Sequence, residues 1–127
     1  ITDAIDIKDA FVINIGVQFE VLTLPNYASR EVLMKCTEAL KEYFSSSKRD
    51  INQPVNTSNV FTVLDGIKGV QTVKTVKLTN KATGNYSAFA YDVDGATKEG
   101  VVYPSYDPCI FEIKYPDIDI EGRVTTI

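Results

Sequence analysis

The sequence predicts an α+β domain: a mostly antiparallel sheet with two helices packed on one face and a protruding hairpin excursion. Three observations indicate this fold class. A long stretch of apolar–polar alternation comes first, two segments with helical spacing follow, and stretches rich in Val, Thr and Ile come later. The length of 127 residues, with 44% hydrophobic and 24% charged residues, is typical of a single globular domain.

Residues 1–10 are polar and short, and we interpret them as a linker or a lead-in from a preceding domain. Residues 11–127 are predicted to form one α+β domain. Because the sequence begins with Ile1 rather than Met, we expect it to be a piece of a longer protein. Its net charge of −4 and scattered basic residues argue against a nucleic-acid partner. No apolar run approaches the roughly 20 residues of a membrane span, so we expect no membrane contact.

The first predicted strand starts at Phe11, where apolar residues begin to alternate with others. The intervening positions are Asn14, Gly16, Gln18 and Glu20. This period of two predicts a long strand with one buried and one solvated face. Leu24 and Pro25 end the strand, and a helix with apolar residues at three- and four-residue spacing follows over residues 32–44.

A second, shorter helix is predicted to start at Thr57 or Ser58. Gly66 is placed to close it in a left-handed cap, and Gly69 to turn the chain into a strand over residues 70–79. The two helices are expected to cover the first strand. The predicted core consists of Ile13, Ile15, Val17, Phe19 and Val21 against Val32, Cys36, Leu40, Phe44, Val60, Phe61 and Leu64.

The segment of about residues 80–104 differs from the preceding strands and helices, because it contains several glycines and is enriched in aromatic residues. We interpret this segment as a protruding hairpin excursion, with a tight turn at Asp94 and Gly95. Two strands over residues 109–115 and 118–124, separated by Pro116, are predicted to complete the domain.

The sequence offers little for catalysis. Histidine, the commonest general base and metal ligand, is absent, which excludes a Ser-His or Cys-His hydrolase within this piece. Cys36 lies on the apolar stripe of the first helix. We interpret Cys36 and Cys109 as two buried thiols, although a disulfide stays possible if folding brings them together. We therefore predict no catalytic residues, no cofactor, no metal and no enzymatic activity.

Two acidic patterns have structural explanations. The segment 92–95 with Glu99 fails the ligand spacing of a calcium loop and fits a hairpin turn better. Asp117, Asp119 and Glu121 alternate with Ile118 and Ile120. This row fits a solvated strand face, or a sheet edge protected by charge, better than a cation site.

The aromatic residues of the excursion are the predicted interaction site. They are Tyr86, Phe89, Tyr91, Tyr103 and Tyr106. Aromatic side chains are favoured at interface hot spots because they bury a large area at low entropic cost. A small local core beneath the excursion explains the same residues equally well.

The order of the motifs resembles the baseplate J-like family. A long strand and a helix lead into Ile51-Asn52-Gln53-Pro54-Val55, then a short helix, then Gly66-Ile67-Lys68-Gly69-Val70 at a strand entry. The segment 115–124, Tyr-Pro-Asp-Ile-Asp-Ile-Glu-Gly-Arg-Val, is similar to the family's closing strand. The resemblance covers residues 11–79 and 109–124. The excursion at 80–108 departs from the typical member and is similar to the larger, ring-forming wedge proteins of T-even-type contractile phages.

The resemblance implies a structural, non-enzymatic role in the tail baseplate of a virion, assembled in the host cytoplasm. It further implies homodimeric contacts within a ring and contacts with other baseplate wedge subunits. A carbohydrate- or receptor-binding module that uses exposed tyrosines is the alternative function. The resemblance does not indicate which surface makes the contacts.

Overall fold

The computed structural model describes residues 11–46, 53–82, 84–87, 89–104 and 108–126. The elements are β1 (Phe11–Thr23), α1 (Ser29–Ser46), β2 (Val55–Asn56), α2 (Thr57–Asp65), β3 (Val70–Asn80), β4 (Thr97–Lys98), β5 (Val101–Val102), β6 (Cys109–Glu112), α3 (Pro116–Asp119) and β7 (Ile120–Thr126). One larger sheet, one small sheet and packed helices confirm the predicted α+β class. The predicted lead-in, 1–10, and residues 51–52 of the family-like motif lie outside the described residues.

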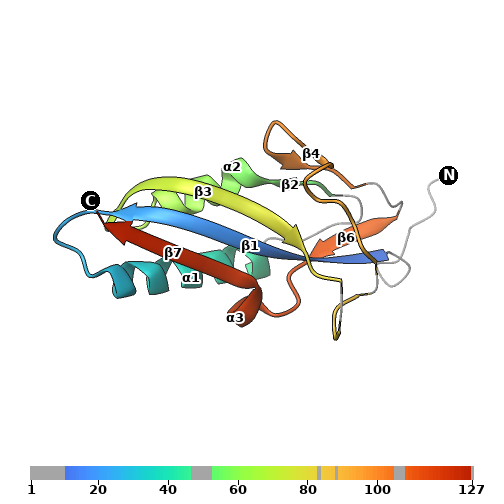
Figure 1. Ribbon diagram of the computed structural model, residues 1–127, viewed down its shortest axis with the longest axis horizontal. Helices are drawn as coiled ribbons and strands as arrows, with labels where there is room; N and C mark the ends of the chain where they lie inside the picture. Colours follow the sequence, from blue (N-terminus) through green and yellow to red (C-terminus); the bar gives the residue numbers. More distant parts are fainter. Residues whose placement is uncertain (1–10, 47–52, 83, 88, 105–107, 127) are drawn as a thin grey trace.

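The central strand of the larger sheet is β1, which runs along most of the length of the molecule (Figure 1). On one side it pairs antiparallel with β3. On the other side it pairs in parallel with two strands in succession, β6 beside residues 11–14 and β7 beside residues 17–23. The small sheet, in the order β2-β5-β4, is antiparallel. Antiparallel pairing therefore predominates, but the larger sheet is mixed.

Both longer helices lie on one face of the larger sheet, as predicted, with α1 against β7 and α2 against β3 (Figure 1). Phe44 is only half-buried, and Phe61 is exposed. The prediction was wrong for Phe61 because it follows Val60 directly, about 100° around the helix from the buried Val60–Leu64 line. The other predicted core residues are all buried, namely Ile13, Ile15, Val17, Phe19, Val21, Val32, Cys36, Leu40, Val60 and Leu64.

The second face of β1 is solvated only in its second half. Gln18 is exposed, whereas Asn14 and Gly16 are buried, contrary to the prediction. A Cβ added to Gly16 would lie 2.9 Å from Cε of Lys81 and 3.1 Å from the carbonyl oxygen of Asp119. The start of the excursion and the end of α3 therefore cover this part of the strand.

The hairpin of the excursion lies later in the sequence than predicted. It is formed by β4 and β5, and Glu99 and Gly100 are its two turn residues, with positive φ angles of 52° and 80°. Positive φ at both central residues is what a tight two-residue hairpin requires. At the predicted turn, Oδ1 of Asp92 accepts a hydrogen bond from the Gly95 amide at 3.0 Å. The segment 92–95 is thus a carboxylate-capped turn that precedes the hairpin.

The predicted excursion is tied to the rest of the domain by strand pairing, hydrogen bonds and apolar packing. β5 pairs with β2, just before α2. The backbone N–H and the hydroxyl of Thr57 donate to the carbonyl of Gly100 at 2.8 and 2.6 Å. Val93 and Val102 are buried in the main core. These contacts give the excursion apolar partners that a free hairpin would lack.

The turn between α2 and β3 uses its glycines differently from the prediction. Asn56 caps α2, its side chain accepting from the Ser58 amide at 2.9 Å. Gly66 ends the helix in a right-handed conformation, with φ of −79°. The left-handed residue is Gly69, with φ of 102°. A Cβ there would lie 2.9 Å from the ring of Tyr27, so close packing and backbone conformation both require glycine.

The first closing strand is shorter than predicted, and the second has the predicted length but lies two residues later. Pro116 starts α3 at a first-turn position, where its missing N–H leaves no donor unsatisfied. The predicted strand 109–115 is β6, which ends at Glu112, and the predicted strand 118–124 is β7, which starts at Ile120.

Candidate interaction surface

Of the five predicted interaction residues, Tyr86 is engaged inside the domain. Its hydroxyl donates to Oδ1 of Asp119 at 2.6 Å, and its ring packs edge-to-face on Tyr115 at 5.4 Å. This hydrogen bond, followed by desolvation, raises the pKa of Tyr86 to about 12. Asp119 is buried, so the contact supplies a partner that a buried carboxylate needs. Tyr86 thereby fastens the excursion to the junction of α3 and β7.

Tyr91 is also held by internal contacts. Its hydroxyl donates to the backbone carbonyl of Tyr103, and its ring packs on Phe111 at 5.9 Å. Its amide donates to Oδ1 of Asn80 at 2.9 Å. Tyr86 and Tyr91 thus belong to the local packing beneath the excursion.

Phe89 and Tyr103 keep a larger part of their surface accessible, 37% and 46%. Phe89 packs edge-to-face on Phe11, with ring centroids 4.6 Å apart. Tyr103 borders a shallow hollow of about 400 Å³, which Tyr91 and Lys98 also line. Tyr106 lies outside the described residues. The structure therefore brings Tyr91 and Tyr103 together at one hollow and places Tyr86 in a different contact.

A polar network centred on Asn14 holds the excursion against β1. The Asn14 side chain accepts from the Ser87 amide at 2.7 Å and donates to Oε1 of Glu112 at 3.1 Å. Its backbone carbonyl accepts from the Lys81 amide at 2.8 Å and from Nδ2 of Asn80 at 3.1 Å. Sequence reasoning assigned Asn14 to solvent. The available signal was an amide between Ile13 and Ile15 with apolar neighbours on both sides.

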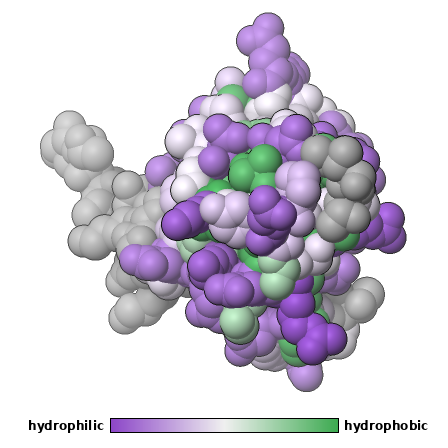
Figure 2. Space-filling model, turned by 90° about the vertical axis from the view of Figure 1, so that its left-hand side faces the viewer, coloured by the Kyte–Doolittle hydropathy of each residue, from purple (hydrophilic) through white to green (hydrophobic). Residues whose placement is uncertain are grey.

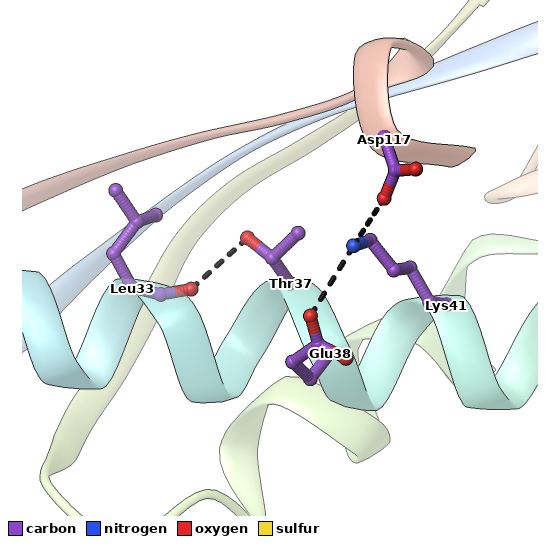
Figure 3. Close-up of polar contacts among 5 residues, drawn as sticks. All are labelled: Leu33, Thr37, Glu38, Lys41 and Asp117. Atoms are coloured by element: carbon purple, nitrogen blue, oxygen red, sulfur yellow. Dashed lines mark hydrogen bonds and ion pairs between the residues drawn. The ribbon is translucent and has the colours of Figure 1, made fainter. Parts of the chain in front are cut away.

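The predicted row of three carboxylates does not exist, because α3 turns the backbone within it. Asp119 faces Tyr86 in the interior. Asp117 points to α1, where Nζ of Lys41 lies 2.5 Å from its carboxylate and 3.2 Å from that of Glu38 (Figure 3). These hydrogen bonds raise the pKa of Lys41, and the bond to Asp117 has the larger effect of the two. Only Glu121 remains on the strand, so neither a solvated row nor a cation site forms here.

The Cys36 thiol is not activated as a nucleophile. Cys36 and Cys109 are both buried, as the interpretation of two buried thiols required. Burial raises the pKa of Cys36 to about 11, which keeps it protonated at neutral pH. Among the residues that the structure describes, no group of three or more acidic or Cys side chains gathers as a metal site would require. The helices in the same part of the chain are too short or too polar to cross a membrane.

The outer edges of the larger sheet remain open. In the described ranges, β3 and β7 each pair only with β1 and have no strand on their other side. Both edges lie along the second half of β1, with β3 beside residues 15–23 and β7 beside residues 17–23 (Figure 1). The end view in Figure 2 has only a small hydrophobic area framed by hydrophilic residues. An outer strand presents backbone donors and acceptors on its unpaired side, so β3 and β7 are the candidate edges for strand pairing.

The two sheet edges carry different charges on the solvated face. Exposed Lys74 and Lys77 lie on β3, and Nζ of Lys74 is 3.5 Å from the Glu20 carboxylate. On β7, exposed Glu121 and Arg123 lie two residues apart on the same face. One edge is thus positive, and the other carries both signs.

The two helices that contact β7, α1 and α3, each carry an exposed large hydrophobic side chain. Met34 on α1 is 59% exposed and Ile118 on α3 is 65% exposed, the largest fractions among the large apolar side chains described. Met34 precedes Thr37 and Lys41 by three and seven positions, so it shares their side of α1. Lys41 contacts α3. We call the β7 edge with Met34 and Ile118 the β7 surface.

A hollow of about 200 Å³ lies beside the first residue of α3, Pro116. Its lining is mostly apolar and comes from β1, the end of α1, β6 and α3, with Ile15, Phe44 and Pro116 among its residues. Lys41 stands at this hollow, but it is already paired with two carboxylates. The hollow therefore presents mainly apolar surface, and the charge of Lys41 at its rim is already neutralised by ion pairs.

A scan against protein-family models found no match, and a search of curated proteins found no similar sequence.

Proposed function

We propose that this chain is a non-catalytic assembly domain of a contractile-tail baseplate. In this role it joins wedge subunits into a ring through contacts with copies of itself and with neighbouring wedge subunits. Its location is the tail baseplate of the virion, after assembly in the host cytoplasm. The observation that carries the proposal is the open β7 edge with exposed Met34 and Ile118 beside it.

Physical reasoning supports an association role for this surface. An open strand presents unpaired N–H and C=O groups, which another strand can satisfy. Exposed apolar side chains next to it add area whose removal from water is favourable. The resemblance of residues 11–79 and 109–124 to the baseplate J-like family supports the baseplate as the setting.

The test is the mass of the purified chain as a function of concentration. Size-exclusion chromatography with light scattering, from about 1 μM to about 1 mM, covers the affinities expected of a weak homodimer. We expect the mass to rise from one chain towards two. One chain at every concentration would contradict the proposal.

A carbohydrate- or receptor-binding module is the second candidate, and the hollow beside Tyr103 favours it. Tyr103 offers an exposed ring, with Asp92 and Lys98 at the same hollow as polar groups. A ring flanked by hydrogen-bonding groups is suited to a sugar. This candidate predicts a monomeric chain that binds a glycan on an array, and loss of binding in Tyr103→Ala.

A further inference from the structure

The β7 edge has a charge pattern that complements itself. Glu121 and Arg123 lie on the same face on either side of Gly122. If two such strands run antiparallel with their Gly122 residues opposite each other, each Glu121 stands opposite an Arg123. Opposite charges in directly facing positions stabilise a strand pair, and like charges destabilise it.

The other face of the strand agrees with the same register. Ile120, Gly122 and Val124 pair with Val17, Phe19 and Val21 of β1, and so lie on the helix-covered face. With Gly122 opposite Gly122, each Ile120 stands opposite a Val124. A shift of one residue would oppose Glu121 to Val124 or Ile120 to Arg123, which mixes charged and apolar partners.

Packing within one chain explains why residue 122 is glycine. A Cβ at this position would lie 2.2 Å from Cζ of Phe19 and 2.7 Å from Cδ1 of Leu33. Phe19 is 3% exposed, so its ring is part of the core. The glycine also leaves the centre of the edge without a side chain, so two backbones can approach closely there.

We propose that two copies of this chain join their β7 edges antiparallel across a twofold axis, with Glu121 of each copy facing Arg123 of the other. This inference rests on the proposed self-association, and adds its surface and register. A twofold axis makes every contact occur twice, so one complementary pair becomes two. Ile118 of each copy, two residues before the paired segment, then lies near the end of the other copy's β7.

The β3 edge is a poorer choice for the same contact. Its exposed charges, Lys74 and Lys77, are both positive, so no antiparallel register of two β3 strands brings opposite charges together. The segment 91–94 also borders a hollow with the last residues of β3. Lysine on an open edge is a known protection against strand pairing.

Charge reversal followed by mixing tests the register. Glu121→Arg alone places four positive charges at the twofold contact, and Arg123→Glu alone places four negative ones. Each is expected to raise the dimer dissociation constant by about tenfold or more, because two attractions become two repulsions. A mixture of the two variants restores opposite pairs, as does the double variant Glu121→Arg/Arg123→Glu.

Sedimentation velocity of the full chain is the measurement, with circular dichroism to verify that each variant is folded. Lys77→Glu is the matched control, since it changes the net charge as Arg123→Glu does but lies on β3. We expect weak association of each single variant, recovery in the mixture and in the double variant, and no change in the control.

Three results would overturn the inference, and they are distinguishable. If the wild type dimerises and the single variants dimerise equally well, another surface carries the association and the proposed function stands. If the single variants are weakened but mixing restores nothing, the register is wrong. A wild type that stays monomeric removes both the inference and the proposed function.

Discussion

The two outer strands of the larger sheet are alike in position and opposite in chemistry. β3 and β7 flank the same central strand, and each has an open side within the described residues. The solvated face of β3 carries two lysines, whereas that of β7 carries Glu121 and Arg123. Charge on an edge strand is commonly interpreted as protection. The sign and spacing of the charges therefore decide whether an edge strand repels or attracts a copy of itself. Like charges repel the copy, and alternating charges attract it.

The largest expected effect comes from filling the glycine of β7. Gly122→Ala introduces a methyl group against the buried ring of Phe19, and we expect a loss of about 2 to 3 kcal/mol in the free energy of unfolding from overpacking. Urea denaturation measures it. Thr75→Ala on exposed β3 is the control, with a change within about 0.5 kcal/mol. Equal losses in both variants would remove the distinction between the two strands.

The end of β3 depends on polar contacts rather than on close packing. Asn80 donates to the carbonyl of Asn14 and accepts from the amide of Tyr91. Asn80→Ala removes both hydrogen bonds and is expected to lower the unfolding free energy by about 1 to 2 kcal/mol. The same denaturation experiment applies. Amide exchange at Tyr91 should also accelerate, and unchanged exchange would contradict the assigned anchor.

The contribution of Tyr86 to the stability of the protein should depend on pH in the alkaline range. Because its folded pKa is raised from 10.0 to about 12, its contribution to stability is complete below pH 10 and is lost as the pH rises towards 12. Tyr86→Phe lacks this contribution. The stability difference from wild type is therefore expected to shrink across that window in urea titrations. Tyr103→Phe, at a half-exposed ring, serves as the comparison and should follow the wild-type profile.

The smallest expected effect concerns exposed side chains beside each edge. Met34→Ser removes apolar area from the β7 surface and should weaken dimerisation by about threefold without changing stability. Phe61→Ser removes comparable area from α2, at a hollow shared with Val73 of β3. Sedimentation velocity compares the two variants. If Phe61→Ser weakens association more than Met34→Ser does, β3 rather than β7 lies at the contact.

The sequence was sufficient to predict the elements that bury one face. Alternation along β1 and helical spacing in α1 and α2 identified ten of the twelve predicted core residues, because burial imposes those periods. The direction of strand pairing, parallel or antiparallel, produces no such pattern in the sequence. Both parallel partners of β1 were unanticipated, since β6 and β7 have the same alternation in either direction.

The candidate surface was harder to predict because it depends on what lies next to each residue in space. Nothing in the aromatic content of the excursion separates Tyr86, which meets a buried Asp119, from Tyr103, which stays accessible. Likewise, β2 is only two residues long, and such a strand has no period to recognise. Its pairing with β5 is nevertheless what returns the excursion to the domain.

The parallel pairing of β1 has a consequence for the order of events during synthesis. β1 emerges from the ribosome before its neighbours on one side, β6 and β7, which lie about a hundred residues later. Contacts so distant in sequence form late and slow the search for the native state. A nascent chain therefore keeps that side of β1 open until residues 109–126 have been made. Since β7 itself forms the proposed contact, two chains would meet there only after each has completed its own sheet.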